Sequence, residues 1–334
     1  MFIIYRTLII ALLGGGLAYF VGLPSAWLIG AVLAVLFAAT KGINVSMFAS
    51  TGKVISLLLG ISVALNLDSG LLNELSHWGG SVLLLTGLVT LVLIVQYRFY
   101  MRLPYWTPAE ALFCAIPGNL AITLSVAEGS SVNLRRVAIV HSVRVCFLVT
   151  LLPLLFPIAE RPLTFEGFSM EHPEYALITI VSAWGGGYVM SKWKIPAPML
   201  ISGFAVTLLL KTQLGWDWHF PDMVFILILV GLGASIGARF NAIQIREVLP
   251  ELKAALGGLL LMLLISGGFA FLLWYFLGVP WLQAMLAYAP GGMEVMIAIA
   301  INQQVDPIFV ASHQMLRMLA MSMLLPLLLK RVGA

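Results

Sequence analysis

The stretch YAPGGMEVMIAIA, residues 288 to 300, decides the fold of this chain. It places a Pro-Gly-Gly sequence and the carboxylate of Glu294 inside a run that is otherwise apolar enough to lie in lipid. A second stretch, FCAIPGNLAITLSVA at residues 113 to 127, carries a similar Pro-Gly interruption. Proline lacks an amide donor and glycine loosens the backbone, so both stretches predict a broken helix at membrane depth.

The composition predicts an integral membrane protein embedded in a lipid bilayer. Of the 334 residues, 61% are hydrophobic and only 10% are charged, whereas about a quarter of a soluble protein is charged. The net charge of +4 comes from Lys and Arg residues that lie mainly between apolar runs. There they report orientation in the membrane, so we expect no nucleic-acid partner.

The chain reads as two copies of one membrane repeat, residues 1–160 and residues 173–334. At a fixed offset of 173 residues, the window 117–155 shares twelve of its 39 positions with the window 290–328. Such self-similarity is typical of transporter repeats. The predicted apolar segments are 4–21, 25–40, 52–66, 79–98, 108–127, 134–157, 175–191, 197–212, 221–237, 252–278, 281–300 and 307–330.

Charge predicts that the two repeats are inverted. The connection 67–78 has no basic residue, whereas its counterpart carries Arg239, Arg246 and Lys253. Inversion requires an odd number of crossings per repeat, so one of the six segments must enter and leave on the same side. The fifth segment is the natural choice, because it contains the Pro-Gly break.

The expected fold is therefore an all-α polytopic membrane protein with 5+5 inverted repeats, ten transmembrane helices and two re-entrant Pro-Gly hairpins. Both termini are then cytoplasmic. In this topology 14 of the 16 Lys and Arg residues outside the membrane lie inside the cell, against 9 inside and 7 outside if all twelve segments cross.

Two matched breaks predict one substrate site. In transporters, interrupted segments at equivalent places of two inverted halves usually meet near the midplane, where helix-end N–H groups face anions and carbonyl groups face cations. The predicted substrate-binding residues at the breaks are Pro117, Gly118, Asn119, Ser125, Pro290, Gly291, Gly292 and Glu294.

The helix after each break carries charge inside the membrane, and its role stays open. IVHSVRVCFLV (139–149) holds His141 and Arg144, and ASHQMLRMLAM (311–321) holds His313 and Arg317. An arginine near a helix centre costs at least about 2.5–3.5 kcal/mol, so it should face a cavity or a partner. Each arginine could bind an anionic substrate, or its planar donors could satisfy the carbonyl groups of its own hairpin. Glu294 could carry a proton, help to coordinate a cation, or pair with Arg317.

The sequence predicts no enzyme, no metal site and no cofactor. The five histidines are scattered without metal-ligand spacing. No phosphate loop, dinucleotide fingerprint or serine nucleophile elbow occurs. A coupling H+ or Na+ is the one ion that we expect.

The PGN and PGGME breaks, the H-x-x-R and H-x-x-x-R helices ending in TLLPLL and SMLLPLLLK, and the duplication resemble the bacterial AbrB-duplication membrane family. The resemblance implies a duplicated domain in the inner (cytoplasmic) membrane. Members are labelled either ammonia monooxygenases or membrane regulators, but this sequence holds no copper or iron ligand cluster. The first repeat has PGN with Ala121 where the second has PGG with Glu294, so an acid-dependent step would belong to one half.

We expect a secondary active transporter of a small organic anion or amino acid, coupled to protons or another ion. Alternating access would take place around the two broken re-entrant segments. Two alternatives remain, a passive channel for a small solute such as ammonia and a non-transporting membrane regulator. The partners are then an anionic or zwitterionic small molecule and lipid, and a homodimer is compatible with this mechanism.

Overall fold

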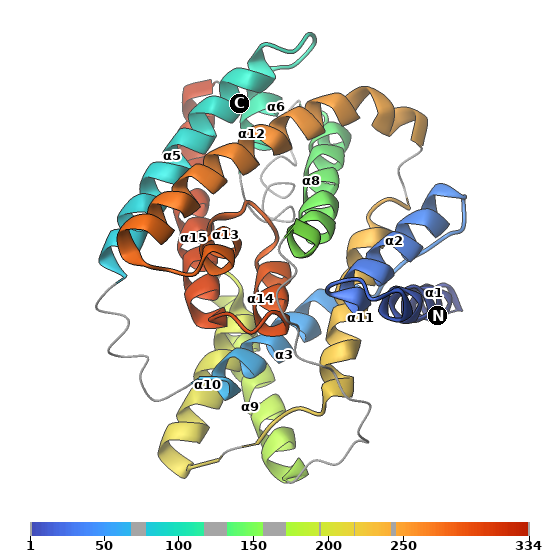
Figure 1. The fold of residues 1–334 in the computed structure, drawn as a ribbon, viewed down its shortest axis with the longest axis vertical. Coiled ribbons are helices and arrows are strands. Elements are labelled where there is room, and N and C mark those ends of the chain that lie inside the picture. Colours follow the sequence, from blue (N-terminus) through green and yellow to red (C-terminus); the bar gives the residue numbers. More distant parts are fainter. Residues whose placement is uncertain are drawn as a thin grey trace. The chain divides into compact units, whose positions relative to one another are not determined.

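The computed structural model describes residues 2–67, 78–116, 132–155, 172–193, 195–216, 218–241 and 245–332. Within these ranges the regular structure is entirely helical (Figure 1). The helices are α1 (Phe2–Val21), α2 (Ala26–Thr40), α3 (Thr51–Leu65), α5 (Gly79–Met101), α6 (Pro108–Ala115), α8 (Leu134–Leu155), α9 (Pro173–Lys192), α10 (Pro198–Leu214), α11 (Asp222–Ala238), α12 (Ile245–Leu277), α13 (Trp281–Tyr288), α14 (Met293–Asn302) and α15 (Pro307–Val332).

The predicted apolar segments correspond to these helices, with three differences. The segment predicted at 108–127 is helical over α6, which ends at Ala115, and its residues from 117 onward lie outside the described residues. The segment predicted at 281–300 is divided into α13 and α14, and α12 begins at Ile245 instead of residue 252. Proline stands in the first turn of α6, α9 and α10, where its missing N–H would have no partner within the helix.

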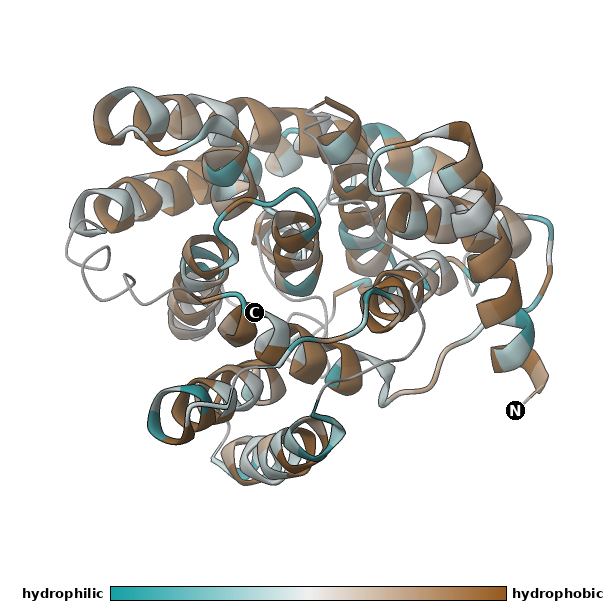
Figure 2. Cartoon of the chain, turned by 60° about the horizontal axis from the view of Figure 1, so that its bottom comes forward, coloured by the Kyte–Doolittle hydropathy of each residue, from teal (hydrophilic) through white to brown (hydrophobic). Residues whose placement is uncertain are grey.

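The helices are apolar around most of their circumference. Figure 2 shows hydrophobic residues along the helices and hydrophilic residues mainly near their ends and in the connections. Among the described residues, α1, α5, α8 and the part of α12 from Leu249 to Leu277 are long and apolar enough to cross a membrane. Large side chains such as Phe20, Leu83 and Phe276 are exposed, as expected for helices that face lipid. The chain is a membrane protein.

The chain forms two compact units, and neither is one of the predicted repeats. Unit 1 comprises residues Met1–Leu71, Pro157–Asn241 and Ile301–Ile308. Unit 2 comprises residues Leu72–Phe156, Ala242–Ala300 and Phe309–Ala334. Each unit therefore takes segments from both predicted repeats, and the repeat boundaries at 1–160 and 173–334 stay a prediction.

Unit 1 contains two helix triplets, α1–α3 and α9–α11, that pack in matching pairs. Helix α1 packs on α2 and α9 packs on α10, while α2 packs on α11 and α3 packs on α10. At the α3–α10 crossing, a Cβ added at Gly60 would lie 2.2 Å from the carbonyl oxygen of Leu200. The helices approach this closely because glycine has no side chain.

The directions of the helices in unit 1 follow from these contacts. Gly60 lies near Leu200, and farther along both helices Lys211 Nζ donates to Leu65 O over 2.7 Å, so α3 and α10 run parallel. Gly233 lies against Leu28 and Gly237 against Val35, so α2 and α11 also run parallel.

In unit 1, the C-terminus of α3 lies near the N-terminus of α11. A cleft there is lined by residues of α3, α11 and the α14 end: Ser62, Leu65, Asn66, His219, Phe220, Asp222, Phe225, Ile301 and Asn302. Helices α3 and α11 are therefore antiparallel. Asn241, after the end of α11, accepts from Val45 N over 2.9 Å, after the end of α2. Helix α2 thus runs opposite to α10.

Unit 2 contains α5, α6, α8, α12, α13, most of α14 and most of α15. Helix α12 packs on α5, α8 and α13, and α6 packs on α5 and α8. The side chain of Gln96 in α5 donates to Gly258 O in α12 over 2.6 Å and is buried. Most of α8 is buried, so any polar side chain on this helix needs a partner inside the protein.

Candidate functional site

The second Pro-Gly stretch breaks the helix where the sequence predicts a break. Helix α13 stops before Ala289, which is extended with φ −62° and ψ 138°. The N–H of Gly291 donates to Ala289 O over 2.8 Å around Pro290. Helix α14 starts at Met293 with Glu294 in its first turn, where the helix dipole favours a negative charge. The carbonyl groups at the end of α13 therefore need donors from outside the helix.

Two side chains of α15 supply these donors. Arg317 donates through Nη1 to Ala289 O over 2.5 Å and through Nη2 to Gly291 O over 3.2 Å. Gln314 donates through Nε2 to Leu286 O over 2.7 Å and to Ala289 O over 3.2 Å. Arg317 Nη2 also donates to Gln314 Oε1. The two side chains hold the end of α13 against α15.

The predicted first repeat has a similar arrangement at the end of α6. Ile116 follows the helix and is extended with φ −69° and ψ 119°. Arg144 of α8 donates through Nη2 to Ile116 O over 3.2 Å, and His141 Nε2 lies 3.0 Å from Phe113 O. The distance between Arg144 Nη2 and His141 Nδ1 is 2.8 Å. Because a carbonyl only accepts and a guanidinium only donates, His141 carries its proton on Nε2.

The predicted site residues beyond this point of the first repeat lie outside the described residues. They are Pro117, Gly118, Asn119 and Ser125.

The contacts at the ends of α6 and α13 correspond at the offset of 173. The offset takes Phe113 to Leu286 and His141 to Gln314, and both pairs are joined by a hydrogen bond. It also takes Ile116 to Ala289, the residue whose carbonyl accepts from the arginine in each repeat. The sequence analysis did not single out Gln314, although applying the same offset to His141 would have found it.

His313 of α15 bonds to residues other than Arg317. His313 Nε2 lies 2.8 Å from Ser81 Oγ, and its Nδ1 lies 2.8 Å from Phe309 O. Its ring packs against Phe309 and Trp78, with centroid distances of 4.0 Å and 5.8 Å. His313 therefore joins α15 to the start of α5, and Gln314 takes the place beside the arginine.

Both guanidinium groups are buried. Arg144 is 2% exposed and Arg317 is 4% exposed. In each side chain the Nε atom has no hydrogen-bond partner among the described residues. The hydrogen bonds of the Arg317 Nη atoms go to Ala289 O, Gly291 O and Gln314 Oε1.

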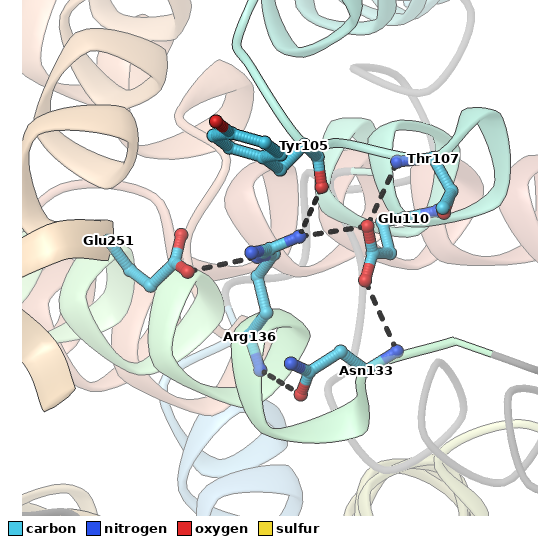
Figure 3. A network of polar contacts seen from close by, with 6 residues as sticks. All are labelled: Tyr105, Thr107, Glu110, Asn133, Arg136 and Glu251. Atoms are coloured by element: carbon cyan, nitrogen blue, oxygen red, sulfur yellow. Dashed lines mark hydrogen bonds and ion pairs between the residues drawn. The ribbon is translucent and has the colours of Figure 1, made fainter.

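Unit 2 also contains a polar network at the N-terminus of α6 (Figure 3). Arg136 of α8 donates to Glu110 Oε2 and to Glu251 Oε1, each over 2.9 Å, and its Nη1 donates to Tyr105 O over 3.0 Å. Asn133 N also donates to Glu110 Oε1 over 3.3 Å. The network links α6, α8 and α12.

Glu110 is held in its charged form. Its carboxylate accepts from Thr107 N over 2.9 Å, and the Thr107 side chain accepts from Glu110 N over 3.2 Å, which is a capping box. Burial alone would raise the pKa of Glu110, but these hydrogen bonds and the charge of Arg136 outweigh burial and lower it.

An aromatic pair occupies the equivalent positions of the predicted second repeat. At the offset of 173, Arg136 corresponds to Phe309, and Glu251 corresponds to Trp78. The rings of Trp78 and Phe309 meet edge to face, with centroids 5.4 Å apart. The same two positions therefore touch in both cases, with an ion pair in one and an aromatic pair in the other.

Within the described ranges, no group of three His, Cys, Asp or Glu residues is arranged to hold a metal ion. Two relatives and one family model match most of this chain. A protein of Escherichia coli (strain K12) named "Putative regulator AbrB" is 26% identical over 312 residues, which cover 89% of this chain and 87% of that protein.

A second relative, "Uncharacterized protein YhjN" of Bacillus subtilis (strain 168), is 24% identical over 357 residues, covering 94% of this chain and 88% of that protein. These names state no catalytic activity. The family model described as "Transition state regulatory protein AbrB" matches residues 27–333. This chain, with its two arginine-bound helix ends, is therefore a member of the AbrB family.

Proposed function

We propose that this chain is a secondary active transporter of a small organic anion or amino acid, driven by a proton or sodium gradient. The observation that carries the proposal is the matched pair of helix ends, each followed by an extended residue and bound by a buried arginine of the next long helix. One such end could be a scaffold detail. Two equivalent ends in a duplicated chain are typical of transporter substrate sites.

The arginine contacts support a site for a physical reason. Backbone carbonyl groups freed by a helix break cannot be left unsatisfied in lipid, where each would cost several kcal/mol. Arg144 and Arg317 satisfy them while keeping a positive charge next to the break. A break that is held open in this way can present helix ends to a solute.

The helix directions in unit 1 support the inverted topology. Lys211 donates to Leu65 O and to Leu67 O, so residues 65 and 211 lie at the same end of their helices. Five predicted segments separate these two residues. An even number of crossings is needed to return to the same side, which fits a segment 108–127 that does not cross. Helix α10 also runs opposite to its repeat counterpart α2, as inversion requires.

The division into units also fits alternating access. Each unit takes segments from both predicted repeats. In transporters with inverted repeats, movement of one such body against the other opens the substrate site to each side of the membrane in turn. Ten spans, two re-entrant hairpins, cytoplasmic termini and an inner-membrane location complete the proposal. Its site consists of the residues of the two breaks with Arg144 and Arg317.

Reconstitution into proteoliposomes tests this function. Uptake of labelled carboxylates and amino acids is measured with an imposed proton or sodium gradient, and again after an ionophore has removed the gradient. We expect accumulation that depends on the gradient and falls strongly in Glu294→Gln. The matched control is Glu174→Gln, because Glu174 lies in the first turn of α9 and is exposed. Linear flux without a gradient requirement would indicate a channel instead.

A regulator is the second candidate, because the names of the family and of the Escherichia coli relative include that function. A regulator of this kind would bind a solute without moving it. Saturable binding by the purified protein, together with no flux in proteoliposomes for any bound solute, would favour the regulator over the transporter.

A further inference from the structure

His313 of α15 is a buried titratable group whose hydrogen bonds go to α5 and to its own helix. The side chain is 0% exposed. Its Nε2 atom lies 2.8 Å from Ser81 Oγ, and its Nδ1 atom lies 2.8 Å from Phe309 O. Each ring nitrogen carries either one proton or one lone pair, so these two contacts occupy both atoms. The proton count of the ring therefore depends on what Ser81 and Phe309 can donate or accept.

The contacts as they stand fit a charged imidazolium ring. Phe309 O is a carbonyl oxygen and only accepts, so Nδ1 must donate to it. Ser81 Oγ donates its one hydroxyl proton to another carbonyl oxygen, Trp78 O, over 2.7 Å. While Ser81 donates there, its oxygen can only accept from His313. Both ring nitrogens then carry a proton.

The same atoms also fit a neutral ring after one hydroxyl group has turned. When Nε2 loses its proton, the Ser81 O–H group can leave Trp78 O and donate to Nε2, while Nδ1 still donates to Phe309 O. Trp78 O keeps a donor, because Val82 N donates to it over 3.0 Å in the first turn of α5. The two forms differ by one proton and one rotation about the Cβ–Oγ bond of Ser81, with every heavy atom in place.

Opposing effects act on these two forms. Burial among apolar side chains favours the neutral ring, whereas an acceptor at each ring nitrogen favours the charged ring. Histidine is also the side chain whose ordinary change of charge falls between about pH 5 and 8. His313 thus has the properties of a group that takes up and releases a proton inside the membrane.

The described contacts of His313 come from three helices. Trp78 and Ser81 contact the ring from α5, and neither of them titrates. From α13, the ring centroid of Tyr288 lies 6.0 Å from that of His313, and Tyr288 Oη donates to Ser81 O over 2.6 Å. Along α15 the nearest charged residue is Arg317, four positions farther on. Tyr288 and Arg317 are therefore the titratable groups that these contacts and spacings bring close to the ring.

This polar cluster belongs to one predicted repeat only. The offset of 173 takes its three polar residues to apolar ones: His313 to Val140, Ser81 to Ala254, and Tyr288 to Ala115. The first repeat holds the end of α6 without any of these polar groups, so the cluster is not required to hold a broken helix end. Buried polar groups also cost free energy unless every one of them is satisfied. The cluster therefore indicates a role that the other repeat does not share.

We infer that His313 is the proton-binding site of this protein and that the Ser81 hydroxyl turns with its charge. The inference rests on the proposed function and names the coupling ion of that function, H+ instead of Na+. Of the two candidates for the proton, Glu294 and His313, it selects His313. Uptake of a proton from the aqueous side at higher proton concentration forms an N–H bond at Nε2. Release on the other side breaks the same bond, and the Ser81 hydrogen bond reverses each time.

The position of His313 connects the proton to the substrate. Tyr288, which packs near the ring, is followed directly by Ala289, whose carbonyl accepts from Arg317. Protonation of His313 therefore adds a positive charge beside the second broken helix end. An added positive charge favours an anion at the same place, so the proton and an anionic substrate should move in the same direction.

NMR of the full-length protein in detergent, with the histidine ring nitrogens labelled with ¹⁵N, tests the proton site. An imidazolium ring shows two protonated nitrogens, and a neutral ring shows one protonated and one bare nitrogen. The signal that disappears in His313→Gln identifies the ring among the five histidines. The four other histidines are assigned in the same way, which identifies His313 by elimination if its own variant does not fold. We expect the His313 signal to change from the charged to the neutral pattern within about pH 5–8, and one unchanged pattern over that range would overturn the inference.

Ser81→Ala tests the hydroxyl group. The hydroxyl accepts from the charged ring and donates to the neutral ring with unequal strength, so its loss should move the pH midpoint of the His313 signal by about one unit. The control is Thr86→Ala, because Thr86 is exposed on α5 and donates to Val82 O of the same helix. An equal midpoint in Ser81→Ala and wild type would refute the inferred role of Ser81.

Proteoliposomes test the coupling. The probes are labelled succinate, lactate and glutamate, with either a proton or a sodium gradient imposed. His313→Gln should lose accumulation driven by the proton gradient but keep the exchange of labelled for unlabelled probe, because exchange needs no net movement of protons. A merely structural defect would lower both. The control is His172→Gln, because His172 is exposed at the start of α9.

The inference and the proposed function can fail separately. Accumulation driven by sodium alone, or driven by protons equally in wild type and His313→Gln, would overturn the inference and leave the transporter standing. A His313 signal that titrates, without flux of any probe, would uphold the proton site and count against transport of these anions.

Discussion

Replacing Gln314 by histidine should leave the protein nearly as stable as wild type, whereas replacing it by alanine should destabilise it. In the first repeat, His141 occupies the equivalent position and makes the equivalent contacts, to Phe113 O over 3.0 Å and to Arg144 Nη2 over 2.8 Å. A histidine at 314 can therefore reach Leu286 O and accept from the arginine of its own repeat. Alanine can do neither.

The size of the effect follows from the hydrogen bonds that are lost. Gln314 donates to two carbonyl oxygens and accepts from Arg317. A neutral buried hydrogen bond contributes about 1 kcal/mol and one to a charged group about 1.5–3 kcal/mol. Gln314→Ala should thus lower the free energy of unfolding by about 3–5 kcal/mol, and Gln314→His by less than about 1 kcal/mol.

Thermal unfolding in a single detergent measures this difference. A loss of this size lowers the Tm by roughly 6 °C or more in a folding unit of this size. Gln213→Ala is the control, because Gln213 is exposed on α10. The reasoning is refuted if Gln314→Ala unfolds at the wild-type temperature, or if Gln314→His loses as much as Gln314→Ala.

Three further predictions concern the helix crossing, the polar network and the topology. Gly60→Ala should unfold at a much lower temperature than wild type, because the added Cβ would lie 2.2 Å from a carbonyl oxygen of α10, whereas Gly16→Ala should be neutral because nothing lies within 4 Å of its added Cβ. The pKa of Glu110 is lowered in the folded protein, so its stabilisation is present above the unfolded value of 4.5 and is lost as the pH falls through the folded value. Unfolding measured against pH should therefore show a shallower acid loss in Glu110→Gln than in wild type, and equal slopes would contradict the network. Single cysteines at Ser131 and Gln304 should label from the cytoplasmic and external sides respectively, and labelling of both from one side would exclude the inverted topology.

Composition and pattern were sufficient to predict the membrane class and the helix positions. Helices such as α1 and α5 are apolar around their whole surface, and lipid requires every backbone group of such a run to bond within the helix. The break at Pro290 could also be predicted from local sequence, because proline removes a backbone hydrogen bond from any helix in which it lies. No knowledge of neighbouring helices was needed.

Partners of individual side chains could not be read from spacing. His313 and Arg317 are four residues apart on α15, which places them on adjacent parts of its surface. Only the packing of α5 and α13 around that helix decides that His313 bonds to Ser81 and that Gln314 bonds to Leu286. Likewise, Glu251 meets Arg136 although 115 residues separate them.

The sequence by itself determined what lipid and backbone chemistry impose on each segment: an all-helical membrane chain, two Pro-Gly interruptions and an arginine after each one. The tertiary structure decided which carbonyl groups those arginines bind, which residue accompanies them, and that each compact unit takes segments from both halves. Segment properties depend on neighbours along the chain, whereas buried hydrogen bonds depend on which helices share a core. A buried guanidinium must find a partner, but only packing determines which one.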